Sequence, residues 1–310
     1  MLTDKPQILV IGGSYFLGRV FCRLCSEGGL ADLFVINRGR YKLDLPGVRE
    51  YQADRHDASS LDHIVKEELI RQDFDAVVDL CAYQPGDIAA LLNLVKGRCN
   101  RYVYVSTSSV YQASDIAKDE DAPLLDEFPA GEVGSYVQDK RYLENELDWG
   151  SAQVDMDYTV FRPSFIFGPY NYAPRESWLI ERIIKGQPVP YPSDASAKFS
   201  MVYVSDAARA LIAAATSERS GKQLYNLASP EQIDYDRLFQ ELELQNGQSF
   251  LRNPMGIEKI IEDNVGLAFP LDQNDLLDAN RFTRDFEFSW TPFSEGMRKT
   301  FKAFKAVFTK

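Results

Sequence analysis

The sequence predicts an α/β fold in which a parallel sheet is covered by helices on both faces. Short apolar runs of strand length alternate with segments of helical periodicity through the first half of the chain. The first run leads through a glycine-rich turn into a helix, and hydroxyl-bearing residues cluster after the fifth run. Such alternation is typical of parallel strands joined by crossover helices, which bury both faces of a sheet.

Six segments are strand-like runs. They are residues 7–11, 33–37, 48–53, 76–80, 101–106 and 158–162. Helical periodicity lies between them, most clearly over residues 59–71, 87–96 and 133–149.

A second lobe is expected after the sixth strand, because five prolines between residues 169 and 192 interrupt the strand pattern. The chain then returns to the first domain with a strand and an alanine-rich helix. The predicted first domain is residues 1–167 with the return segment 199–228, and a smaller C-terminal α+β lobe takes residues 168–198 and 229–310. Helices are expected in this lobe near residues 234–244 and 293–305.

Composition argues against several classes of protein. The 310 residues are 45% hydrophobic and carry a net charge of −12. This acidic balance opposes the basic face that binds nucleic acid, so no nucleic-acid partner is expected. No segment approaches the roughly 18 apolar residues of a membrane span, and the first residues lack the apolar stretch of a signal peptide. A cytoplasmic location without membrane contact is therefore expected.

The cysteines and histidines predict neither a disulfide framework nor a metal site. Cys22 and Cys25 lie in the middle of the first predicted helix, whereas redox pairs use a helix N-terminus. We interpret them as small core residues. His56 and His63 lack the spacing of metal ligands, so no metal is expected.

The glycine-rich turn over residues 12–18 is typical of a pyrophosphate site, because its N–H groups and the positive helix end face the same point. Gly12 would make the tight turn, and Gly18 would let the helix approach the strand. Tyr15 replaces a middle glycine, so its side chain must point away from the phosphates or obstruct them. An ordinary strand-to-helix turn is the alternative. The residues expected to bind the cofactor here are Gly12, Ser14, Tyr15, Phe16 and Leu17.

Tyr136 and Lys140 are four residues apart, so both project from one face of a predicted helix. A phenol that acts as a base near neutral pH needs its pKa lowered by about three units, and a neighbouring ammonium has that effect. The alternative is a plain exposed pair. Residues 106–111 place several hydroxyls after the fifth strand, at the edge where parallel sheets bind ligands. A serine-rich helix cap is the alternative there.

With these motifs in order, the chain resembles the extended short-chain dehydrogenase/reductase family of NAD(P)-dependent nucleotide-sugar epimerases, dehydratases and reductases. The resemblance covers nearly the whole chain. The matching motifs are residues 12–18, Asp54, Val110 with Tyr111, Tyr136 with Lys140 and Glu144, Arg162 with Pro163, residues 168–171 and residues 202–206. The bulky residue in the glycine turn and residues 37–39 are most similar to the branch that contains the chloroplast stem-loop-binding proteins and their bacterial relatives.

The resemblance implies a Rossmann-type doubly wound domain for the dinucleotide and a substrate-binding C-terminal lobe. It implies that Tyr136 is the general acid/base and that Lys140 holds the nicotinamide ribose. Thr107 would hydrogen-bond the same substrate oxygen as Tyr136. The expected activity is epimerisation of a nucleotide-activated sugar. The alternatives are an NADPH-dependent carbonyl reductase and a non-catalytic relative that binds a dinucleotide or RNA. Dehydration is disfavoured, because Ser108 and Ser109 replace the acidic pair of the family's dehydratases.

The resemblance also implies cofactor contacts. Asp54 would accept from the adenine amino group, and Ala82 would leave room for the cofactor. Arg55 and Asp57 are interpreted as a solvated charge run. Asn37 and Arg38 end the second strand without an acid for the ribose hydroxyls of NAD, which favours NADP slightly.

The expected substrate contacts are Ser108, Asn171, Arg182 and Lys198. Tyr83, Gln112 and Tyr203 depart from the family pattern. Residues 114–123 are expected to form a solvated acidic loop, with a lid as the alternative. The resemblance further implies a possible homodimer.

Overall fold

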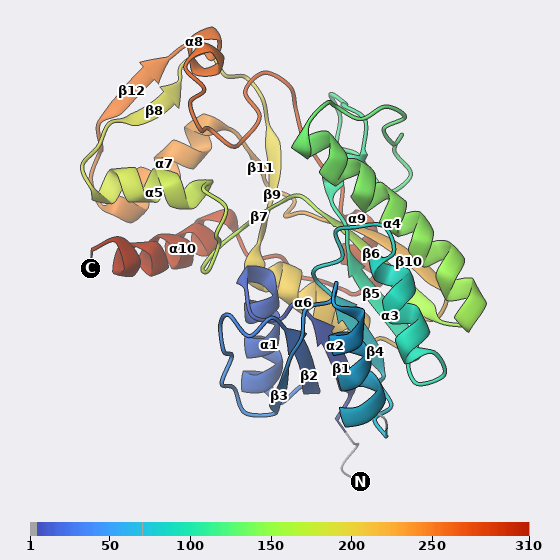
Figure 1. The fold of residues 1–310 in the computed structure, drawn as a ribbon. Coiled ribbons are helices and arrows are strands. Elements are labelled where there is room, and N and C mark those ends of the chain that lie inside the picture. The colour runs from blue at the N-terminus through green and yellow to red at the C-terminus, as the bar shows by residue number, and fades with distance from the viewer. Residues whose placement is uncertain (1–4, 70, 310) are drawn as a thin grey trace. The chain divides into compact units, whose positions relative to one another are not determined.

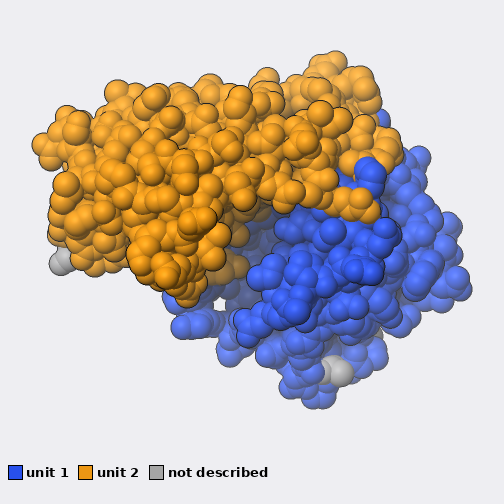
Figure 2. Space-filling model, turned by 90° about the horizontal axis from the view of Figure 1, so that it is seen from above, with its two compact units in different colours: residues 1–111, 123–163, 207–225 blue, residues 112–122, 164–206, 226–310 orange. Residues whose placement is uncertain are grey.

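The computed structural model describes residues 5–69 and 71–309. Two compact units are coloured separately in Figure 2. The first comprises residues 1–111, 123–163 and 207–225, and the second comprises residues 112–122, 164–206 and 226–310. Residues 112–122, 164–167, 199–206 and 226–228, which were expected in the first domain, fall in the second unit.

Seven strands form the central sheet in the order β10-β6-β5-β4-β1-β2-β3 (Figure 1). The pairs β3–β2, β2–β1, β1–β4, β4–β5 and β5–β6 are all parallel. The strands are β1 (Gln7–Ile11), β2 (Asp32–Asn37), β3 (Val48–Gln52), β4 (Ala76–Asp79), β5 (Arg101–Val105), β6 (Asp157–Pro163) and β10 (Lys222–Leu227). The predicted Rossmann-type sheet is therefore confirmed, and each of the six predicted strands ends within one residue of its expected bounds.

Helices pack on both faces of this sheet. Successive side chains of a strand point to opposite faces, so each strand contributes to two packed layers. Leu9 of β1 belongs to a buried cluster with Ile88 of α3 and Leu143 of α4. Val10 lies on the opposite face, where a Cβ on Gly13 would meet both the Val10 side chain and Cys22 of α1. The helical elements are α1 (Phe16–Gly28), α2 (Ala58–His63), the π-helix η1 (Ile64–Glu68), α3 (Asp87–Val95), the 3-10 helix η2 (Ser108–Val110), α4 (Glu132–Val154) and α6 (Val204–Ala215).

The second unit is an α+β structure with two small sheets. These have the strand orders β11-β9-β7 and β12-β8. The strands are β7 (Phe165–Phe167), β8 (Val189–Pro192), β9 (Phe199–Tyr203), β11 (Gln232–Ile233) and β12 (Arg252–Met255). The helices are α5 (Glu176–Ile184), α7 (Tyr235–Asn246), α8 (Ile257–Glu262), α9 (Asn280–Asp285) and α10 (Phe293–Phe308). Helix α10 packs against α5 and α7.

Residues 114–123 form a loop that is exposed at most positions, as expected, but it is anchored at two buried residues. Lys118 and Glu120 are both buried. The Lys118 N–H donates to the Leu276 carbonyl at 3.0 Å, and a Glu120 carboxylate oxygen accepts from the Asn226 N–H at 2.9 Å. Composition did not reveal these two anchors, because their partners lie far along the chain.

Three further expectations concern the cysteines, membrane spans and metal ligands. Cys22 and Cys25 are buried, and burial raises the pKa of the Cys25 thiol to about 12, so both behave as core residues. None of the helices in the described part of the chain combines the length and apolar character needed to cross a membrane. Within residues 5–69 and 71–309, no three His, Cys, Asp or Glu side chains gather where they could hold a metal ion.

Candidate active site

The turn between β1 and α1 has a backbone that only glycine fits at two positions. Gly12 has a φ of +92°, which residues with a side chain rarely adopt. A Cβ on Gly18 would lie 2.7 Å from the Gly12 carbonyl oxygen, so α1 approaches the turn only because residue 18 is glycine. Helix α1 begins at Phe16 without a side-chain cap and has no acid in its first turn. Its first N–H groups can therefore receive a phosphate.

The side chains of this turn differ in what they can offer a ligand. Phe16 and Leu17 are buried, so only their backbone groups are available. The Ser14 carbonyl accepts a 3.5 Å hydrogen bond from an Arg19 guanidinium N–H. The Tyr15 ring packs edge-on against Tyr41, with centroids 4.7 Å apart. Tyr15 is therefore directed towards the loop between β2 and β3.

A cavity of about 400 Å³ lies at the carboxyl ends of β2 and β3. It is lined by Arg38, Gln52, Ala53, Asp54 and Ser60. The structure thus brings together Arg38 and Asp54, two residues expected to bind the cofactor. Gln52 was not predicted, although the parallel register that pairs it with Asn37 places it at the same sheet edge. The cavity could hold one end of a dinucleotide.

Asn37 has a buried side chain that shapes the turn after β2. Its Nδ2 donates to Glu50 Oε2 at 3.3 Å, and its Oδ1 accepts from the Gly39 N–H at 2.7 Å. Gly39 has a φ of +73°, so this side chain stabilises a left-handed residue in the turn. Asn37 therefore has a structural role that its sequence position did not indicate.

Lys140 places a buried cation at the end of the sheet. Its Nζ donates hydrogen bonds of 2.9 Å to the carbonyl oxygens of Ala82, after β4, and Val105, at the end of β5. Burial lowers the pKa of this ammonium to about 8, and the Asp79 carboxylate acts in the opposite direction. The carboxyl ends of adjacent parallel strands are where open α/β sheets bind ligands.

Tyr136 and Thr107 lie near the same strand ends. Tyr136 precedes Lys140 by one helical turn and is 39% exposed, with its ring centroid 5.9 Å from the Lys140 Nζ. Thr107 follows Val105 by two residues, and its Oγ1 accepts from the Ser109 N–H at 3.2 Å. The structure therefore brings Tyr136, Lys140 and Thr107 to one edge of the sheet, as the motifs predicted.

A buried ion pair fixes α4 against the strands behind this site. Arg162 of β6 donates through Nε and Nη2 to the two carboxylate oxygens of Glu144, at 2.9 and 2.6 Å. Ser106 Oγ donates to the same carboxylate at 2.6 Å. Burial alone would lower the pKa of Arg162, but the hydrogen bonds and charge of Glu144 raise it. Because Glu144 is one turn after Lys140, the pair also positions that lysine.

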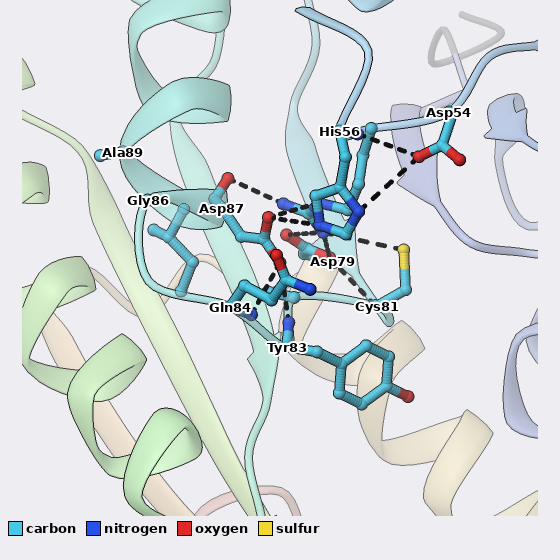
Figure 3. Close-up of polar contacts among 12 residues, drawn as sticks. Asp54, His56, Asp79, Cys81, Tyr83, Gln84, Gly86, Asp87 and Ala89 are labelled. Carbon is cyan, nitrogen blue, oxygen red and sulfur yellow. Dashed lines mark hydrogen bonds and ion pairs between the residues drawn. The ribbon is translucent and has the colours of Figure 1, made fainter. Parts of the chain in front are cut away.

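A second buried cluster lies at the end of β4 around Asp79 and Asp87 (Figure 3). Arg55 Nη1 donates to both Asp79 carboxylate oxygens at 2.8 and 3.0 Å, and Nη2 donates to the Asp87 carbonyl at 2.7 Å. The expectation that Arg55 is solvated is wrong, because its side chain is only 8% exposed. The acids that pair with it are distant in sequence, so its local charge run was misleading.

The predicted substrate residues are dispersed within the chain. Ser108 is buried in η2. Asn171 is also buried, with its Nδ2 on the Glu176 carboxylate at 3.0 and 3.1 Å. Arg182 on α5 donates through Nε to the Pro188 carbonyl at 2.8 Å, and Lys198 is exposed before β9. In the described part of the chain, Asn171, Arg182 and Lys198 form no hydrogen bond or ion pair with one another.

Tyr203 and Tyr83, which depart from the family pattern, lie in different units of the chain. Tyr203 is a buried residue of the second unit, with its ring centroid 5.6 Å from that of Phe167. Its position is therefore a packing position. Tyr83 is 43% exposed and lies in the first unit, where its ring centroid is 4.4 Å from the Lys140 Nζ.

Comparisons with known proteins concern the family and the fold. The model of the NAD dependent epimerase/dehydratase family matches residues 8–228. The chloroplast stem-loop binding protein of 41 kDa b from Arabidopsis thaliana is 28% identical over 249 residues, which are 76% of this chain but only 62% of that protein. The 2'-dehydrokanamycin reductase of Streptomyces kanamyceticus is 25% identical over 82% of this chain and 70% of that protein.

Solved structures share the fold over almost the whole chain. UDP-glucuronic acid 4-epimerase from Bacillus cereus, in complex with NAD, has a TM-score of 0.79 at 19% identity and covers 97% of this chain and 99% of its own. UDP-glucose 4-epimerase from Thermus thermophilus, also with NAD, has a TM-score of 0.77 at 19% identity with the same coverage. The dTDP-glucose 4,6-dehydratase of Bacillus anthracis has a TM-score of 0.78 at 18% identity and covers 97% of both chains.

Proposed function

This chain belongs to the NAD dependent epimerase/dehydratase family, and from that premise we propose that it is an NAD(P)-dependent epimerase of a nucleotide-activated sugar. One observation carries the proposal. The Lys140 Nζ donates hydrogen bonds to the Ala82 and Val105 carbonyls. The helix that bears Tyr136 and Lys140 therefore lies at the end of β5, close to Thr107. A cation, a phenol and a hydroxyl at one strand end can bind a ribose and move a proton.

Each of these residues has a distinct role in the proposed reaction. A nicotinamide held beside these residues would supply hydride transfer from the sugar carbon and back to its other face. Tyr136 takes the proton of the hydroxyl on that carbon and later gives it back, so protons balance over one cycle. Thr107 donates a hydrogen bond to the same oxygen, and Lys140 donates its remaining N–H to the cofactor ribose.

The first unit would hold the rest of the cofactor. The uncapped N-terminus of α1 suits the pyrophosphate, and the cavity with Asp54 and Arg38 suits the adenosine end. Arg38 would offer a cation to the additional phosphate of NADP, so we infer a slight preference for NADP. Residues 168–198 and 229–310 would supply the substrate contacts, among them Asn171, Arg182 and Lys198, and a homodimer remains a prediction.

Carbonyl reduction is the second candidate, favoured by the similarity to 2'-dehydrokanamycin reductase. The two reactions differ in how they use the cofactor: an epimerase retains it through the cycle, whereas a reductase exchanges it. Elimination of water is disfavoured, because Ser108 and Ser109 cannot act as acid and base near neutral pH. A role in RNA binding is disfavoured by the net charge of −12.

Tyr136→Phe tests the proposal, because it removes the phenolic oxygen and keeps the ring. We expect turnover of the accepted nucleotide sugar to fall by about 10²–10⁴-fold, while the dissociation constant for the dinucleotide stays nearly constant. Tyr142→Phe is the matched control, since Tyr142 lies on the same helix and is similarly exposed at 44%. Full activity of Tyr136→Phe would show the assignment to be wrong. Analysis of the dinucleotide that copurifies with the wild type separates epimerase from reductase.

A further inference from the structure

Three tyrosine rings surround the ammonium of Lys140. The ring centroids of Tyr83, Tyr104 and Tyr136 lie 4.4, 5.0 and 5.9 Å from the Nζ. Each distance is within the roughly 6 Å over which a ring face attracts a cation. With the two carbonyl acceptors, this environment solvates a charge that has little contact with water, since Lys140 is only 3% exposed.

The rings and the burial change the pKa of Lys140 in opposite directions. Burial disfavours the charged form and lowers the pKa of Lys140. A ring that faces the ammonium stabilises only the charged form, by about 0.5–2 kcal/mol when water is excluded. The other charged or titratable groups that face Lys140 are Asp79, Cys81, Arg55 and Asp87.

The backbone of Tyr83 is fixed by the cluster around Asp87 (Figure 3). Asp87 Oδ2 accepts from the N–H groups of Tyr83 and Gln84, at 2.8 and 3.0 Å. Asp87 Oδ1 lies 3.0 Å from His56 Nε2 and 3.4 Å from Arg55 Nε. The segment that carries Tyr83 is therefore held at several points, so its ring can keep one position beside Lys140.

We propose that Tyr83 is a positioning residue for Lys140: its ring keeps the ammonium charged and in place beside Tyr136, and thereby sets the highest pH at which the site operates. Tyr83 is the ring nearest to the Nζ, and at 43% exposure it can be replaced without opening a cavity in the core. The consequence for the site rests on the function proposed above, whereas the titration of Lys140 depends on the geometry alone.

Titration of Lys140 by NMR tests the proposal directly. Protein labelled with ¹³Cε-lysine is titrated, and the resonance that Lys140→Met lacks is assigned to Lys140. We expect the wild type and Tyr83→Phe to titrate at the same pH, because phenylalanine keeps the ring. In Tyr83→Leu the midpoint should fall by about one pH unit. Tyr142 is as exposed as Tyr83 but points away from Lys140 on α4, so Tyr142→Leu should leave the midpoint unchanged.

Two outcomes would overturn the proposal: a Tyr83→Leu midpoint equal to that of the wild type, or a Tyr83→Phe midpoint as low as that of Tyr83→Leu. Dinucleotide affinity measured from pH 6 to 10 is the second readout. Tyr83→Leu should bind as tightly as the wild type at pH 6 and lose affinity at a lower pH than the wild type. If no variant binds a dinucleotide, the proposed function fails, while the NMR titration still decides the role of Tyr83.

Discussion

The cavity at β2 and β3 and the Lys140 environment at β4 and β5 are built differently, although both lie at the carboxyl edge of one sheet. Arg38 and Asp54 in the cavity are exposed to solvent. Lys140 is buried between two carbonyls and three rings. Water screens a charge in the first region and not in the second. We infer that the cavity tunes which dinucleotide binds, and that the buried region performs the chemistry.

The largest effect on turnover is expected from a change at the buried Lys140. Lys140→Met should lower turnover by about a hundredfold or more, because the ribose and Tyr136 both lose their cation. The pKa of Lys140 is about 8, so the lysine is charged below that pH and neutral above it. Wild-type affinity for the dinucleotide should therefore fall as the pH rises above about 8, and that of Lys140→Met should not. Equal pH profiles would contradict this role.

Arg55→Met should destabilise the fold by about 3–5 kcal/mol, because it leaves the fully buried Asp79 carboxylate without its cationic partner. The free energy of unfolding in urea measures this. Arg23→Met removes an exposed pair with Glu27 and should cost less than about 1 kcal/mol. If Arg55→Met and Arg23→Met lower the free energy of unfolding by the same small amount, the buried cluster does not stabilise the fold.

A smaller effect is expected in the cavity. Arg38→Ala should weaken NADP binding about tenfold and leave NAD binding nearly unchanged, because an exposed cation contributes little more than that to a phosphate contact. Titration calorimetry with both dinucleotides measures the ratio. Arg40→Ala is the control, since Arg40 is exposed two residues further along and does not line the cavity. Equal weakening of NAD and NADP would rule out Arg38 as the discriminating residue.

The smallest effect concerns two tyrosines of β5. Tyr104 has a buried hydroxyl without a hydrogen-bond partner among the described residues, whereas the Tyr102 hydroxyl donates to Asp79 at 2.6 Å. Tyr104→Phe should therefore raise the free energy of unfolding by about 1 kcal/mol, and Tyr102→Phe should lower it by a similar amount. Thermal unfolding of both variants checks the signs. A clear loss in Tyr104→Phe would mean that its hydroxyl has a partner.

The sequence alone was sufficient for six of the seven strands of the sheet, for the glycine-rich turn, and for placing Tyr136 and Lys140 on one helix face. The six predicted strands lie within one residue of their expected bounds, and most of them are buried and apolar, as is usual for parallel strands that are covered on both faces. Gly12 and Gly18 are required by local backbone geometry. Tyr136 and Lys140 share a helix face by their spacing. Each of these features depends on residues that are close in the chain.

Only the tertiary structure showed which charges are buried and what surrounds them. Arg55 meets Asp79, and Lys140 meets the Ala82 carbonyl 58 residues away, across turns that no local pattern connects. Asn171 was expected at the substrate, but its amide is used by Glu176. The physical reason is that burial and electrostatic environment depend on the packing of distant segments, whereas strand and helix formation depend largely on neighbouring residues.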